Sequence, residues 1–158
     1  MTPLETPRLQ TIVSGGQTCV DRAALEAGLP CGGWCPTGRR AEDGVIPSKY
    51  PVAELPGRGY LPRTRRNVLD SDATLIVTFG EPSGGTARTV EFCRKLQKPF
   101  LVIDGETQAV DEGVTRVNEF LVRFHVRSLN VAGPRGGREP RAYPYAYNLI
   151  RKLLAIIR

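Results

Sequence analysis

The sequence has no long apolar run. None of its hydrophobic stretches approaches the roughly 20 residues of a membrane-spanning helix, and Met1 to Pro7 lack the apolar segment of a secretion signal. These absences argue against a membrane or secreted protein. We therefore expect a cytoplasmic protein with no membrane partner.

Metal-binding and nucleophilic patterns are also scarce. The chain has one histidine, His125, and four cysteines: Cys19, Cys31, Cys35 and Cys93. Cys31 and Cys35 lack the matching second pair that a zinc site normally needs. His125 has no carboxylate or serine partner nearby in the sequence. We therefore expect no zinc site, reduced thiols, and no catalytic residue among these side chains.

The net charge of +6 comes from 22 basic and 16 acidic residues, and the basic ones are mostly arginines. The planar arginine fork suits phosphate or carboxylate partners, although a general composition bias would give the same excess. The basic residues form no block, and aromatic residues make up only 7% of the chain. A nucleic-acid interface needs such features, so nucleic acid is not the expected partner.

Apolar patterns predict strands that alternate with helices. We expect strands at 9–13, 31–35, 51–55, 73–79, 100–103 and 129–132, and helices at 18–27, 61–70, 86–97, 110–126 and 143–157. A polar loop is expected at 36–48. This order predicts an α/β fold, a Rossmann-like three-layer sandwich whose mostly parallel sheet carries helices on both faces. Residues 1–158 are expected to form one domain.

Two glycine turns follow predicted strands and precede predicted helices. They are Ser14-Gly15-Gly16-Gln17-Thr18 and Ser83-Gly84-Gly85-Thr86, and Gly133 follows a third strand. Glycine lets backbone N–H groups approach an anion, and the helix N-terminus adds a positive dipole end. The carboxyl ends of parallel strands share one sheet edge, so these turns predict a phosphate-binding site for a nucleotide-like ligand. The alternative is a pair of tight turns that bind nothing.

Charged residues near the first turn are further candidates. Asp21 and Arg22 fall in the first helical turn, where they could face the ligand or complement the helix dipole and each other. In the loop that follows, Arg39 and Arg40 could clamp an oxyanion, and Glu42 or Asp43 could hold a sugar hydroxyl or a magnesium ion. The alternative is a solvated charged loop.

The helix expected at 61–70 carries two more candidates. Thr64 and Asn67 are three residues apart, so they share a helix face and could reach the site. Arg63, Arg65 and Arg66 cannot all point in one direction, so some of them are expected to face solvent.

The chain resembles the family of putative molybdenum carriers over nearly its whole length. The matching blocks are Ser14-Gly15-Gly16-Gln17-Thr18, Gly32-Gly33-Trp34-Cys35-Pro36, Gly38-Arg39-Arg40-Ala41-Glu42-Asp43-Gly44, Asp70-Ser71-Asp72, Gly84-Gly85-Thr86 and Leu129-Asn130-Val131-Ala132-Gly133-Pro134-Arg135. The resemblance implies a Rossmann-like fold related to lysine-decarboxylase-like and DprA-like domains. It also implies a homo-oligomer that binds or carries molybdenum cofactor, a pterin with a phosphate. Cys19 departs from the family, which usually has glycine there.

Two functions are therefore compared. The first is a carrier of a phosphorylated pterin or nucleotide, without turnover. The second is a nucleotide phosphoribohydrolase, because related folds use the glutamate of a Gly-Gly-x-Gly-Thr-x-x-Glu motif to cleave an N-glycosidic bond. Here Thr89 takes the place of that glutamate. Glu91 lies about 200° further round the helix and is expected to face away from the site. The carrier, a non-catalytic ligand-binding protein, is favoured over the enzyme, which remains the alternative.

Overall fold

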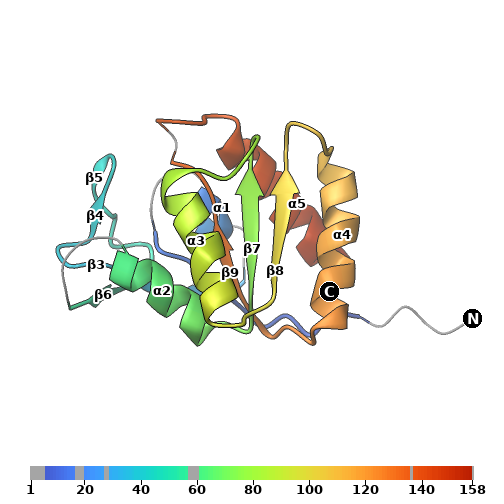
Figure 1. Ribbon diagram of the computed structural model, residues 1–158, viewed down its shortest axis with the longest axis horizontal. Helices are drawn as coiled ribbons and strands as arrows, with labels where there is room; N and C mark the ends of the chain where they lie inside the picture. Colours follow the sequence, from blue (N-terminus) through green and yellow to red (C-terminus); the bar gives the residue numbers. More distant parts are fainter. Residues whose placement is uncertain (1–5, 17–19, 27–28, 57–60, 136, 158) are drawn as a thin grey trace, which may run out of the picture.

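A computed structural model describes residues 6–16, 20–26, 29–56, 61–135 and 137–157 (Figure 1). Its main sheet has five parallel strands. In spatial order they are β2 (Cys31–Gly32), β1 (Thr11–Val13), β9 (Ser128–Ala132), β7 (Ala73–Thr78) and β8 (Phe100–Asp104). The inner strand β7 is buried along its whole length, which its run of apolar and β-branched residues predicts.

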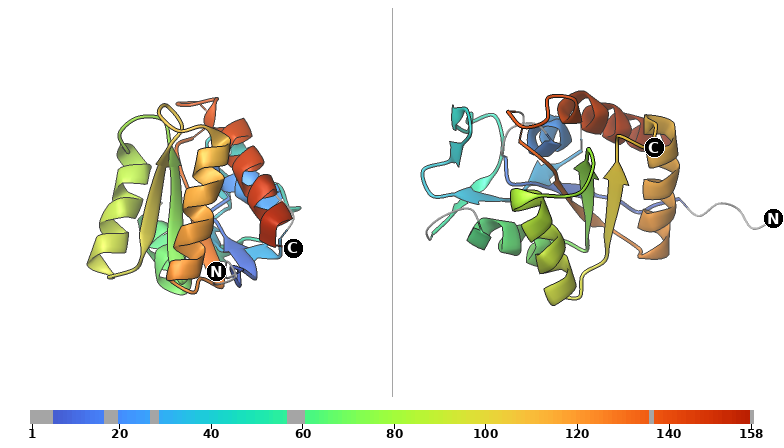
Figure 2. Two further views of the ribbon diagram at one scale, coloured as in Figure 1. Left: turned by 90° about the vertical axis from the view of Figure 1, so that its right-hand side faces the viewer. Right: turned by 45° about the horizontal axis from the view of Figure 1, so that its top comes forward.

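Helices cover both faces of this sheet (Figure 2). Helices α2 (Leu61–Asp70) and α3 (Gly84–Lys95) lie on one face, and α1 (Val20–Glu26), α4 (Val110–Arg123) and α5 (Ala142–Ile157) lie on the other. The main core lies between the sheet and the second group, where the apolar side of α5 packs. The three-layer α/β fold is confirmed. Among the described helices, none combines the length and apolarity needed to cross a bilayer.

The strand order identifies where a ligand would bind. If the chain is followed from β9 through β1, β2, β7 and β8, the spatial order becomes 3-2-1-4-5, the order of a doubly wound sheet. The first strand of that pattern, β9, is the last strand in the sequence of this chain. The direction of winding reverses between β9 and β7, and ligands of such sheets bind beyond the carboxyl ends of the strands at this point.

A smaller unit lies beside the main sheet, in the region where a long polar loop was expected. Strand β3 (Trp34–Pro36) pairs in parallel with β6 (Ala53–Leu55), and β4 (Arg40–Ala41) forms an antiparallel hairpin with β5 (Gly44–Val45). These elements surround a small core of Cys35, Ile46, Tyr50 and Val52. The loop prediction was therefore too simple here, because pairing between distant segments gives this region its structure.

Several element boundaries also differ from prediction. Strand β1 begins at Thr11 rather than Leu9, and the extended segment at 31–35 is divided between two strands of different sheets. Helix α3 begins at Gly84 instead of residue 86, so its glycine turn forms the first turn of the helix itself. This shift matters for the site, because it places Gly84 and Gly85 at the positive end of α3.

Candidate functional site

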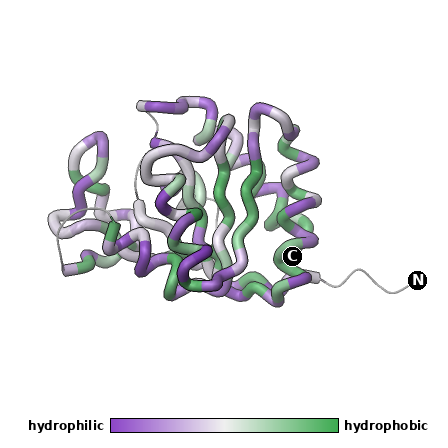
Figure 3. The backbone as a smooth tube through the Cα atoms, viewed as in Figure 1, coloured by the Kyte–Doolittle hydropathy of each residue, from purple (hydrophilic) through white to green (hydrophobic). Residues whose placement is uncertain are grey.

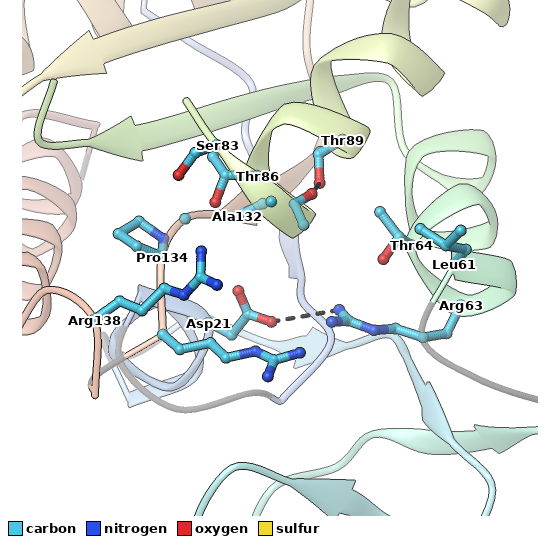
Figure 4. A pocket seen from close by; sticks show the side chains of 14 residues that line it. Asp21, Leu61, Arg63, Thr64, Ser83, Thr86, Thr89, Ala132, Pro134 and Arg138 are labelled. Carbon is cyan, nitrogen blue, oxygen red and sulfur yellow. Dashed lines mark hydrogen bonds and ion pairs between the residues drawn. The ribbon is translucent and has the colours of Figure 1, made fainter. Parts of the chain in front are cut away.

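A pocket lies beyond the carboxyl ends of β9 and β7, at the switch point of the sheet (Figure 4). Four segments form its walls: the start of α1, the first turn of α2, the first turn of α3 and the loop after β9. Its volume is about 190 Å³. The lining residues are Asp21, Leu61, Arg63, Thr64, Ser83, Gly84, Gly85, Thr86, Thr89, Ala132, Gly133, Pro134, Arg135 and Arg138.

The N-terminus of α3 supplies backbone donors to this pocket. Its N-cap residue Ser83 is extended and makes no side-chain cap hydrogen bond. The first amides of a helix have no partner within the helix, and no described residue accepts from the amides of Gly84 and Gly85. A Cβ at Gly85 would meet nothing within 4 Å, so this residue faces open space. The helix end can therefore receive an anion.

Three arginines line the same pocket. The Nη1 atom of Arg138 lies 3.1 Å from where a Cβ of Gly84 would be. Arg63 pairs with Asp21 at 3.5 Å, and its Nε atom is buried without a hydrogen-bond partner in the structure. Arg135 is the third arginine. Asp21 is the one carboxylate among the described lining residues, so positive charge prevails in this pocket.

The first glycine turn serves the pocket indirectly. A Cβ on Gly15 would lie 1.8 Å from Nη1 of Arg63, so only glycine leaves room for this guanidinium to cross the turn and reach Asp21. Gly16, at φ +72°, instead packs against Ile46 of the small core. The predicted residues Gln17 and Thr18 lie outside the described residues, as does Cys19.

The two candidates on α2 separate. Thr64 lines the pocket, whereas Asn67 does not. The Asn67 side chain accepts a hydrogen bond from the Trp34 amide at 2.8 Å and donates to the Trp34 carbonyl at 3.0 Å. Asn67 therefore fastens α2 to β3. Its buried amide is used within the chain, which explains why it does not face a ligand.

The charged residues predicted around the hairpin bind other parts of the chain rather than lining the pocket. Arg22 forms a bidentate pair with Asp43 at 2.5 and 2.8 Å, and this hydrogen bonding lowers the pKa of Asp43. Glu42 accepts a hydrogen bond from the Gly137 amide at 2.8 Å. Among the described residues, no three His, Cys, Asp or Glu side chains gather as a metal site, so nothing supports magnesium here.

Arg39 and Arg40 also bind other parts of the chain and do not line the pocket. Arg39 donates to four backbone carbonyls, at distances of 2.6 to 3.2 Å. These carbonyls belong to Ile46, Pro47, Tyr50 and Val52. Arg40 is exposed and donates to the Thr37 carbonyl at 3.4 Å. Arg39 thus holds the small unit together in place of the expected phosphate clamp.

The residues relevant to hydrolysis lie on opposite sides of α3. Thr89 lines the pocket, and its hydroxyl donates to the Gly85 carbonyl at 3.1 Å. Glu91 is exposed, pairs with Arg88 at 3.1 Å and lines a different groove. The expectation that Glu91 faces away from the site is confirmed.

Eight lining residues were not among the predicted site residues: Leu61, Arg63, Ser83, Thr89, Ala132, Pro134, Arg135 and Arg138. A signal existed for Arg135 and Arg138, because both follow the strand end that carries Gly133. Arg63 precedes the candidate Thr64, but its role depends on the ion pair with Asp21, which only the folded chain brings together.

The fold and this pocket define a doubly wound α/β protein with a cationic site at its switch point. Residues 12–154 match the circularly permutated YpsA SLOG family, and the chain belongs to this family. The late position of β9 agrees with such a permutation. No protein of curated function matches the chain significantly.

One solved structure is closely similar. It is a putative molybdenum carrier protein from Syntrophus aciditrophicus SB, 42% identical in sequence, with a TM-score of 0.93. The similarity covers 95% of this chain and 98% of the other. The resemblance drawn from the sequence motifs is thereby confirmed.

Proposed function

We propose that the protein binds a phosphate-bearing small molecule, a phosphorylated pterin such as molybdenum cofactor or a related nucleotide, and carries it without turnover. Three observations support this proposal: the open N-terminus of α3, the three pocket arginines, and the similarity to a structure named a putative molybdenum carrier protein.

The observation that carries the proposal is the position of Arg138 over Gly84. A guanidinium is unfavourable at the positive end of a helix, because like charges face each other there. No described carboxylate pairs with Arg138. A phosphate between the Gly84 and Gly85 amides and Arg138 would remove this repulsion and form charge-assisted hydrogen bonds.

The pocket's size suggests how the remainder of the ligand lies. Its volume of about 190 Å³ is below the roughly 300–1,000 Å³ of usual ligand pockets. We therefore place the phosphate inside and the ring system at the mouth. Leu61 lines the pocket and is 48% exposed, so it offers an apolar contact for a ring.

A carrier accounts for the side chains better than a hydrolase does. The position of the family glutamate is taken by Thr89, whose hydroxyl is bonded to the helix backbone. The remaining carboxylate of the described lining, Asp21, pairs with Arg63. A general acid or base must be able to exchange a proton with substrate, and this ion pair opposes that role for Asp21.

Calorimetry tests the proposal with molybdenum cofactor, AMP and GMP, and with adenosine and guanosine as controls without phosphate. We expect saturable binding of at least one phosphate-bearing compound, with its phosphate-free counterpart at least about tenfold weaker. If none of these compounds binds, the proposal is wrong.

Chromatography of the nucleotide mixtures tests the hydrolase alternative. We expect no free base to appear. Base that is released by this protein and lost in Glu91→Gln would favour the hydrolase over the carrier.

A further inference from the structure

The two edges of the main sheet differ in length. Edge strand β2 has only two residues, whereas edge strand β8 has five, of which Phe100 to Ile103 are apolar. In Figure 3 the hydrophobic run of β8 lies at the front of the molecule, between α3 and α4, with no helix before it. Proteins usually protect such an edge with lysine, proline or a covering segment, because it pairs readily with another strand.

A groove beside β8 leaves its apolar side chains partly uncovered. Ala87 and Val90 of α3 form one wall, and Phe100 and Val102 of β8 form the other. Phe100, Leu101 and Val102 are half-buried, whereas every residue of the neighbouring strand β7 is buried. A second strand on this edge would therefore bury further apolar surface.

The backbone of β8 is ready for such pairing. The Pro99 carbonyl and the Gly105 amide are bonded to β7, at 3.0 and 2.8 Å. Backbone groups alternate in direction along a strand, so the amides of Phe100, Val102 and Asp104 point to the free edge. A twofold axis at Val102 would set Val102 opposite its own copy and Phe100 opposite Asp104 of the second copy.

Charge favours the antiparallel arrangement of two copies. Basic residues lie near the start of β8: the Arg94 guanidinium lies 5.8 Å from the centre of the Phe100 ring, and Lys98 precedes the strand. Acidic residues lie at its end, namely Asp104 and Glu106. Antiparallel pairing on Val102 brings Arg94 toward Asp104 of the second copy. Lys98 and Glu106 are used within the chain, since Lys98 donates to the Ser71 carbonyl at 3.0 Å and Glu106 pairs with Arg141. Parallel pairing would place like charges together.

We propose that a second copy of this chain pairs with β8 through antiparallel hydrogen bonds centred on Val102, joining two five-stranded sheets into one. The interface is isologous, as the symmetry of most dimers requires. Arg94, Val90 and Phe100 contribute to it on the α3 side. The ligand pocket lies on the other side of α3, so the proposed interface leaves it open.

Light scattering after size exclusion tests the proposal on the full chain and its variants. We expect a dimer whose dissociation constant rises at least about tenfold in Arg94→Glu, since the charge reversal faces Asp104 of the second copy. Val102→Lys should give monomers. Arg88→Glu, on the same helix, and Val45→Lys, on the hairpin, are matched controls that should leave the dimer intact. Circular dichroism verifies that each variant is folded.

Amide hydrogen exchange provides a readout that does not depend on variants. The Val102 amide should become slower to exchange as protein concentration rises, because dimerisation closes the edge. A monomer at every concentration, a dimer unaffected by both edge variants, or a Val102 amide that exchanges rapidly in the dimer would overturn the proposal. Binding of a different protein to this edge in place of a second copy would also contradict it.

Discussion

Two groups of arginines in this molecule have opposite surroundings. Arg22 and Arg39, in and beside the hairpin region, donate to a carboxylate and to backbone carbonyls of the chain itself. In the pocket, Arg63 has a buried Nε donor without a hydrogen-bond partner, and Nη1 of Arg138 lies beside Gly84 at the N-terminus of α3. The first group is a structural support, and the second group provides unused binding capacity. An arginine's function is therefore decided by its acceptors, which its place in a motif does not reveal.

The largest change in stability is expected when the hydrogen bonds of Arg39 are removed. Arg39→Ala leaves four carbonyls without their donor, and we expect a loss of about 3 kcal/mol in the free energy of unfolding. Urea denaturation measures this loss. Arg40→Ala is the matched control, and it should change stability by no more than about 0.5 kcal/mol because Arg40 is exposed. Equal effects of the two variants would abolish the distinction between Arg39 and its neighbour.

The second largest effect is expected on ligand affinity, when the space beside Gly85 is filled. Gly85→Val places a side chain in open space without contacting the protein, so we expect the dissociation constant of a bound mononucleotide to rise about a hundredfold, near 2.7 kcal/mol. Calorimetry measures the affinity. Thermal unfolding should show no loss of stability, because valine is no worse than glycine in a helix. Undiminished affinity would mean that the ligand lies elsewhere.

A pocket arginine should show the reverse of the Arg39 result. Arg138→Ala removes one charge-assisted contact, so we expect affinity for AMP to fall about tenfold while stability stays within about 0.5 kcal/mol. Arg88→Ala on the outer side of α3 should alter neither property. A strong loss of stability in Arg138→Ala would assign this arginine to the structural group.

The smallest effect is the pH dependence of the Arg22–Asp43 pair. Because hydrogen bonding to Arg22 lowers the pKa of Asp43, the folded state favours the ionised carboxylate. This stabilisation is fully present above the unfolded pKa of about 3.9, and it is lost as the pH falls through the folded value. At pH 7, Asp43→Asn should cost less than about 1 kcal/mol, since the pair is partly exposed. Unfolding at lower pH should show this difference shrinking, and a difference that grows would contradict the pairing.

Much of the fold could be predicted from sequence because its strands and helices have clear apolar periods. Helix α2 spans Leu61–Asp70, the range expected from the pattern. The hairpin β4–β5 and the pair β3–β6 could not be found this way. Their strands have two or three residues each, too short for an apolar period, and the Arg39 hydrogen bonds to the Tyr50 and Val52 carbonyls form only in the folded chain.

The candidate site was partly accessible to the same reasoning. Parallel topology predicts that Gly84, Gly85 and Gly133 share one sheet edge, and all three line the pocket. The acceptors of Arg22 and Arg39 were beyond sequence reasoning, because a charged loop contains partners for its own arginines as well as for a ligand. Composition does not decide between those two uses.

The central claim is that an oxyanion binds at the N-terminus of α3 beside Arg138. A titration with inorganic phosphate, followed by NMR on backbone amides, tests it most directly because phosphate is common to the nucleotide and pterin ligands. We expect saturable shifts at the amides of Gly84, Gly85 and Thr86, with little change at hairpin residues 40–45. Saturable shifts centred on the hairpin, or none at the start of α3, would contradict it.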